Sequence, residues 1–172
     1  MFFDRNNIVH NSTLLLLGFA GSTDGNLSSV EMKVIEHFVI TLLHKYNLDI
    51  NNDGEIDSED VHDIVELVKN HLDSFYFSDE KNFLSENNKT FSSLSLDFTR
   101  EISFSIIQIK HAIKYQNISK SLADDILKVL NDIASADGKV SKDEKRWIDV
   151  ISSELKEIWK RFIIPHLLFP SM

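Results

Sequence analysis

The sequence predicts an all-α protein, a single helical-bundle domain of about six to seven helices. Along most of the chain, apolar residues recur at intervals of three and four, the period of a helix with one buried face. The 172 residues include only two prolines and five glycines, so few positions interrupt helices. Hydrophobic residues make up 42% and charged residues 26%, which is ordinary for a globular protein with a real core.

The first expected element contains the apolar run LLLLGFAG, from Leu14 to Gly21, which we interpret as part of a buried helix. The run is too short to span a bilayer, and Asp4 and a thin basic flank argue against a secretory signal. We therefore expect a cytoplasmic protein. The chain has no cysteine, which excludes disulfides, thiolate catalysis and cysteine-ligated zinc.

Five further helices follow from apolar stripes at helical spacing. They are expected at residues 29–46, at about 58–73, at 99–116, and around the stripes at 122–133 and 148–162. Residues 78–95 are rich in Ser, Asn and charge, and we expect a linker there. This linker divides the single domain 1–172 into a first half, 1–77, and a second half, 96–172.

A short element occurs three times, as DGNLSSVE from Asp24, DGEIDSED from Asp53 and DGKVSKDE from Asp137. Each copy begins with Asp-Gly, and glycine suits the left-handed turn that follows a helix. Each then has an N-cap residue with an acid three positions later, the spacing of a capping box. The predicted boxes pair Ser28 with Glu31, Asp57 with Asp60, and Ser141 with Glu144. Each copy therefore predicts a capped joint between two helices.

The middle copy also has the ligand spacing of a calcium loop. Numbering from Asp49 puts oxygen-bearing side chains at loop positions 1, 3, 5, 9 and 12, with Gly54 at the sharp turn and a backbone carbonyl at position 7. The predicted ligands are Asp49, Asn51, Asp53, Glu55 (through its carbonyl), Asp57 and Asp60. Capping does not explain the donors at positions 1 and 3. The alternative is an acidic, well-capped turn without metal.

Asp60 occupies the last position of this loop, where glutamate is the usual ligand. Its side chain is one methylene shorter, so we expect lower affinity for Ca²⁺ or better competition by Mg²⁺. The net charge of −9 is also concentrated here, because no Lys or Arg lies between Lys45 and Lys69. The carboxylates of this segment are Asp49, Asp53, Glu55, Asp57, Glu59, Asp60, Asp63 and Glu66. Such a patch attracts cations and repels nucleic acid, so we expect no nucleic-acid partner.

The phrases FAGSTDGNLSSVE and IASADGKVSKDE resemble the two signature turns of the TerB-like (tellurite-resistance) family. The resemblance covers most of the chain and implies an all-helical fold of two pseudo-repeated halves. It also implies a further set of acidic residues that attract metal, namely Asp24, Glu31, Asp137 and Glu144. Capping is the favoured interpretation of these outer copies, because counting back to loop position 1 gives Ala20 and Ile133, which have no side-chain oxygen. The loop NLDINNDGEIDSEDV separately resembles EF-hands and dockerin-type calcium loops, but it occurs once.

These patterns predict a non-enzymatic module that binds a divalent cation and serves in stress response or scaffolding. An unpaired calcium loop favours stabilisation over switching. The seven histidines form no HExxH pair and the chain has no GxSxG elbow, so zinc and serine hydrolase sites are not expected. The alternative function is a protein–protein interaction adaptor in which the acidic loop is structural only.

The C-terminal stretch ELKEIWKRFIIPHLLFPSM combines Trp, Lys, Arg and Phe with an apolar tail. We expect a last helix that packs on the core and ends or kinks near Pro165. The less favoured interpretation is a segment that contacts a membrane surface or docks on a partner.

Overall fold

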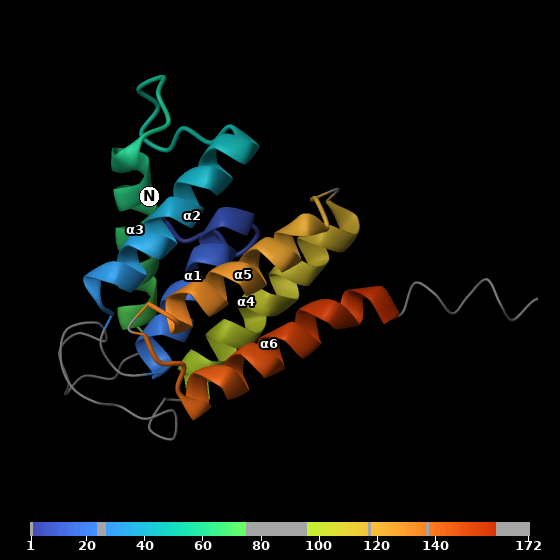
Figure 1. Cartoon of the computed structure of the whole chain (residues 1–172). Coiled ribbons are helices and arrows are strands. Elements are labelled where there is room, and N and C mark those ends of the chain that lie inside the picture. The colour runs from blue at the N-terminus through green and yellow to red at the C-terminus, as the bar shows by residue number, and fades with distance from the viewer. Residues whose placement is uncertain (1, 24–26, 75–95, 117, 137, 161–172) are drawn as a thin grey trace, which may run out of the picture.

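The computed structural model describes the whole chain except residues 1, 24–26, 75–95, 117, 137 and 161–172. The described part contains six helices and no strand, which confirms the all-α prediction (Figure 1). The expected linker at 78–95 and the expected kink near Pro165 lie outside the described residues. The helices are α1 (Ile8–Thr23), α2 (Ser29–Tyr46), α3 (Ser58–Asp73), α4 (Leu96–Tyr115), α5 (Ser121–Ala134) and α6 (Lys142–Lys160).

Helix α1 is the central helix of the bundle, because it contacts each of the other five. Its sequence, IVHNSTLLLLGFAGST, carries no Asp, Glu, Lys or Arg. A helix without a charged face is stable only where other elements surround it. Leu14, Leu15, Leu16, Leu17 and Ala20 are fully buried, and Phe19 is nearly so. The interpretation of LLLLGFAG as a buried helix is therefore confirmed.

The other helices surround α1 with their apolar stripes. Helices α2 and α3 have the predicted bounds, whereas α4 begins three residues earlier than expected and α6 begins before its apolar stripe. Helix α6 packs against α4 and α5, where Lys110 Nζ lies 3.0 Å from Glu154 Oε2. In the described residues, no helix combines the length and the apolar character that crossing a bilayer requires.

Helices α2 and α5 pack side by side in opposite directions. The end of α2 lies at the start of α5, where Lys45 Nζ is 3.8 Å from Asp125 Oδ2. The start of α2 lies at the end of α5, where Val30 and Asp132 line one groove. The acidic loop follows the end of α2 and leads into α3. Because α2 also packs on α5, it links the loop to the second half of the chain.

The segment before α1 contacts α3 and α4. The Phe3 ring stacks on His71 of α3, with ring centroids 3.9 Å apart. Arg5 Nη2 is 2.9 Å from Glu101 Oε1 of α4, and His71 Nε2 is 3.1 Å from Glu101 Oε2. The buried Glu101 carboxylate therefore joins the N-terminal segment, α3 and α4 at one point.

Candidate functional site

All three predicted capping boxes are present. At α2, the backbone N–H of Ser28 donates to Glu31 Oε2 at 2.7 Å and the N–H of Glu31 donates to Ser28 Oγ at 3.2 Å. At α6, the Ser141 N–H donates to Glu144 Oε2 at 2.6 Å and the Glu144 N–H donates to Ser141 Oγ at 3.1 Å. At α3, Asp57 and Asp60 form the same reciprocal pair. Each box satisfies backbone donors that the first turn of a helix leaves without partners.

The acidic residues of the outer copies fall into two groups. Glu31 and Glu144 are 3% and 5% exposed, and their carboxylates take part in the capping boxes. Asp24 and Asp137 lie outside the described residues, so their proposed role near a metal stays a prediction. Gly138 has a φ of +87°, as predicted for the turn glycine of its copy.

The acidic loop begins where α2 ends in a left-handed residue. Asn47 has φ 52° and ψ 51°, and its N–H and that of Leu48 donate to carbonyls in the last turn of α2. Asn52 and Gly54 follow with φ of 62° and +97°. Asparagine tolerates this region better than most residues, and glycine enters it without steric cost. These residues turn the chain back toward α3.

The side chains at the predicted ligand positions accept hydrogen bonds from the loop backbone. Asp49 accepts the N–H of Asn52 at 2.7 Å and that of Gly54 at 2.8 Å. Asn51 Oδ1 accepts the N–H of Asp53 at 3.0 Å, and Asp53 Oδ1 accepts that of Glu55 at 2.9 Å.

The same pattern continues at the other end of the loop. Asp57 Oδ1 accepts the N–H of Glu59 at 2.7 Å. A side-chain oxygen that accepts the N–H two or three residues ahead forms an Asx-type turn, which short polar side chains favour. The loop is therefore wound tightly by its own side chains.

Asp60 is the buried anchor of the loop. Its Oδ1 accepts the N–H groups of Ile50 and Asn51 at 2.7 and 3.1 Å, and its Oδ2 accepts the N–H of Asp57 at 3.1 Å. Burial disfavours the carboxylate, but the three donated hydrogen bonds outweigh burial and lower the pKa of Asp60 below its ordinary value. Asp60 therefore fastens both ends of the loop.

The donors of the loop are chemically suited to a hard cation, because they are carboxylate, amide and carbonyl oxygens. Asn51, Asp53 and Glu55 are exposed, and Asp49 and Asp57 are half-buried. Ile56 packs against the core, as loop position 8 requires. Within the described residues, no three His, Asp or Glu side chains are already gathered to hold a metal ion. Ion binding would therefore require the exposed side chains to turn toward a common centre.

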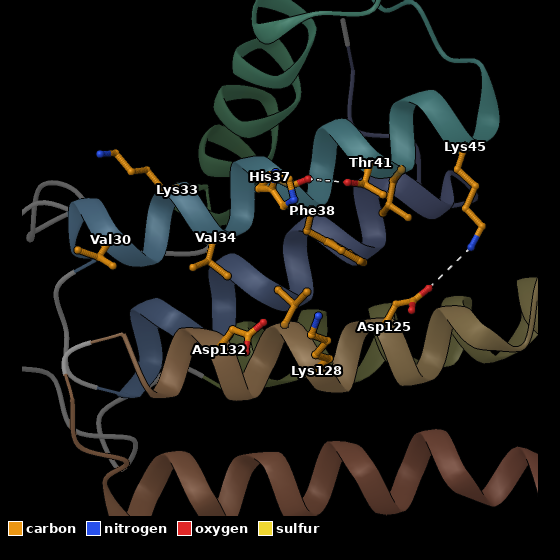
Figure 2. A pocket seen from close by; sticks show the side chains of 12 residues that line it. Val30, Lys33, Val34, His37, Phe38, Thr41, Lys45, Asp125, Lys128 and Asp132 are labelled. Carbon is orange, nitrogen blue, oxygen red and sulfur yellow. Dashed lines mark hydrogen bonds and ion pairs between the residues drawn. The ribbon is translucent and has the colours of Figure 1, made fainter.

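A groove between α2 and α5 was not predicted from the sequence. Its volume is about 510 Å³, and Figure 2 shows the side chains that line it. The α2 residues in it recur at intervals of three and four, from Val30 to Lys45. That stripe mixes apolar residues with Lys, His and Thr, so the sequence gives no sign that it lines a groove. None of the predicted loop ligands lines this groove.

Comparison with protein-family models, curated proteins and solved structures gives no significant match to this chain. The resemblance to TerB-like proteins and to EF-hand loops therefore stays a prediction.

Proposed function

We propose that the loop from Asp49 to Asp60 binds one divalent cation, most readily Ca²⁺, and thereby stabilises the joint between α2 and α3. The observation that supports the proposal is the winding of the loop, in which every predicted side-chain ligand is folded back onto the loop backbone. The hydrogen bonds keep these oxygens within one short loop, where an ion that prefers six to eight oxygens would draw the exposed side chains toward a common centre.

The proposed role of the cation is to offset repulsion among the carboxylates of the loop and of the first turns of α3. The loop and the first turns of α3 carry a run of carboxylates with no lysine or arginine among them. A bound cation would offset the repulsion, which is greatest at low ionic strength. The caps of α2 and α3 are already formed, so binding would stabilise an existing joint, and the protein would be a metal-stabilised scaffold with no catalytic role.

Asp60 limits the expected affinity. Both of its oxygens already accept backbone N–H groups, and it is shorter than the glutamate that usually closes such a loop. The exposed ligands Asp49, Asn51, Asp53 and Asp57, with the carbonyl of Glu55 and water, would therefore supply most of the coordination. This arrangement predicts weaker binding than a loop closed by a bidentate glutamate.

The test is a calorimetric titration of metal-stripped protein with Ca²⁺ and then with Mg²⁺. Asp53→Asn removes one ligand charge but retains an oxygen that can accept the N–H of Glu55. Glu55→Gln is the matched control, because it makes the same charge change at an exposed side chain that is not a predicted ligand. We expect one Ca²⁺ site per chain. Asp53→Asn should lower its affinity for Ca²⁺ at least tenfold, and Glu55→Gln should change that affinity little. Equal weakening by both variants, or no saturable binding at millimolar Ca²⁺, would contradict the proposal.

A further inference from the structure

The groove between α2 and α5 has an apolar floor with charged edges. Phe38 and Leu42 form the buried floor, and Val34 and Val129 are half-buried beside them. Val30 lies at one end and is 52% exposed. At the other end, the ion pair of Lys45 and Asp125 spans from one helix to the other (Figure 2). Exposure of such an apolar surface to water is unfavourable, and covering it with another apolar surface lowers the free energy.

The edges of the groove carry charges that the described part of the chain does not pair. Lys33 on α2 and Lys128 on α5 are exposed, and no carboxylate of the described residues lies within 4.0 Å of either amine. The Lys45–Asp125 pair is neutral, and Asp132 offsets one of the two other lysines, so the charged side chains that line the groove sum to +1 within a chain of net charge −9. In Figure 2 the Lys128 amine points from α5 toward the groove. The Lys33 amine extends from α2 away from α5, so a bound partner's carboxylates would meet Lys33 at the outer rim of the groove and Lys128 on its α5 side.

The shape of the groove suits a helix. It follows α2 from Val30 to Lys45, a distance of about 22 Å at 1.5 Å per residue. A partner helix of about four turns would cover that length. The groove lies between two packed helices, and the ridges of a third helix fit such a groove. A helix that binds in this way presents apolar anchors at intervals of three and four.

We propose that the α2–α5 groove docks an amphipathic helix of another protein, with an apolar stripe facing Phe38 and Val129 and with carboxylates on the flanks facing Lys33 and Lys128. The apolar contacts would supply most of the affinity. The charges would select acidic helices over basic ones, because like charges at the edge are disfavoured. The proposal does not depend on the metal loop, since none of the predicted ligands lines the groove.

The test uses two synthetic helical peptides of 16 residues with the same leucine stripe, one flanked by Glu and one flanked by Lys. Fluorescence anisotropy of labelled peptide gives the affinity, and amide chemical shifts of the protein locate the binding surface. We expect the Glu-flanked peptide to bind more tightly and to shift amides of α2 and α5, with no dependence on Ca²⁺.

Charge-reversal variants test the selectivity. The double variant Lys33→Glu/Lys128→Glu should lower the affinity for the Glu-flanked peptide about tenfold, as expected for the loss of two surface ion pairs at the upper end of their energy range. The same variant should raise the affinity for the Lys-flanked peptide. The control Lys156→Glu changes an exposed lysine on α6 that does not line the groove, and should leave both affinities unchanged. Circular dichroism checks that each variant is folded.

Three results would overturn the proposal. The first is no saturable binding of the Glu-flanked peptide at millimolar concentration, and the second is an equal effect of the Lys156→Glu control. The third is self-association of the protein in sedimentation that Val129→Glu abolishes, because it would assign the groove to a second copy of the chain. Loss of Ca²⁺ binding in calorimetry leaves these outcomes unaffected, so the two proposals fail separately.

Discussion

The carboxylate of Asp60 is fully buried and accepts the backbone N–H of Ile50 at 2.7 Å, ten residues earlier in the chain. The same side chain accepts the N–H of Asp57 at the N-cap of α3. One residue therefore closes the acidic loop and caps the first turn of the following helix. Because its three donors are backbone groups, this part of the loop needs no metal to be held in place.

Removing this carboxylate should destabilise the protein. Asp60→Ala leaves three N–H groups at a buried position without an acceptor, which we expect to lower the free energy of unfolding by about 3 kcal/mol. Asp60→Asn should cost about half as much, because its amide nitrogen cannot accept a hydrogen bond. Urea unfolding measures both, with Asp63→Ala, an exposed change on the same helix, as the control. Equal stability of Asp60→Ala and Asp63→Ala would contradict the anchoring role.

Asp60 should also contribute to stability in a pH-dependent way. Its pKa is lowered from an ordinary value of 3.8, so the folded protein binds a proton there less readily than the unfolded chain. The stabilisation is therefore complete above pH 3.8 and is lost as the pH falls through the lower folded-state pKa. The stability difference between the wild type and Asp60→Asn should shrink below pH 4. A constant difference from pH 6 to pH 3 would contradict this assignment.

His10 should make folding sensitive to mild acid. Its Nδ1 accepts the backbone N–H of Asp4 at 2.9 Å, so the neutral ring fits this site and a protonated Nδ1 does not. Burial lowers the pKa of His10 below 6.5, with His71 acting in the same direction, and the nearby Asp4 opposes this shift only in part. The unfolded chain therefore takes up the proton first, and stability should fall as the pH drops below 6.5 toward the folded-state pKa.

The variant His10→Asn separates this effect from that of the other histidines. The oxygen of asparagine can accept the Asp4 N–H in place of Nδ1, but the side chain does not titrate. Unfolding in urea at pH 7.5 and pH 5.5 should show a smaller loss of stability in the variant than in the wild type. An equal loss in both proteins would assign the acid sensitivity to other groups.

Local features of the fold could be predicted from the sequence, whereas contacts between distant segments could not. The three capping boxes were predictable because each involves residues three positions apart, and the first residues of α2 and α3 followed from the same caps. Glu101 shows the limit, because it meets Arg5 and His71, which are 96 and 30 residues away. Nothing in the spacing of those residues indicates that they lie together.

The groove and the anchoring role of Asp60 also depended on the structure. From the sequence, the α2 stripe that contains Lys33 and His37 is expected to be an exposed helix face. It lines a groove only because α5 packs beside it. The spacing of the sequence predicted two roles for Asp60, as a metal ligand and as the acid of a capping box. The structure shows the cap and adds the bonds to Ile50 and Asn51, which depend on how the loop winds.

The two serine caps of the outer copies offer a matched pair. Ser28→Ala and Ser141→Ala each remove the acceptor for the N–H of a buried glutamate. Each should lower the free energy of unfolding by about 1 kcal/mol. Neither should alter calcium affinity if the outer copies are only capped joints. Calorimetry on both variants checks this, and a loss of calcium stoichiometry in either would support the metal role predicted for Asp24 or Asp137.

Gly54→Ala tests how far the loop depends on its left-handed turn. Gly54 has φ +97°, and a Cβ at this position would meet no atom within 4 Å, so any cost comes from the backbone conformation alone. We expect the substitution to lower the free energy of unfolding by about 1 kcal/mol. Gly138→Ala provides the comparison, because that glycine has a similar φ of +87° and equally open surroundings but lies in the joint between α5 and α6.

Calcium affinity then separates the two glycines. If the cation binds at the loop, Gly54→Ala should lower the calcium affinity several-fold, because Asp53 and Glu55, two of the predicted ligands, flank this glycine. Gly138→Ala should leave the calcium affinity unchanged. Equal calcium affinities, together with equal losses of stability, would mean that the turn at Gly54 serves only to connect α2 with α3.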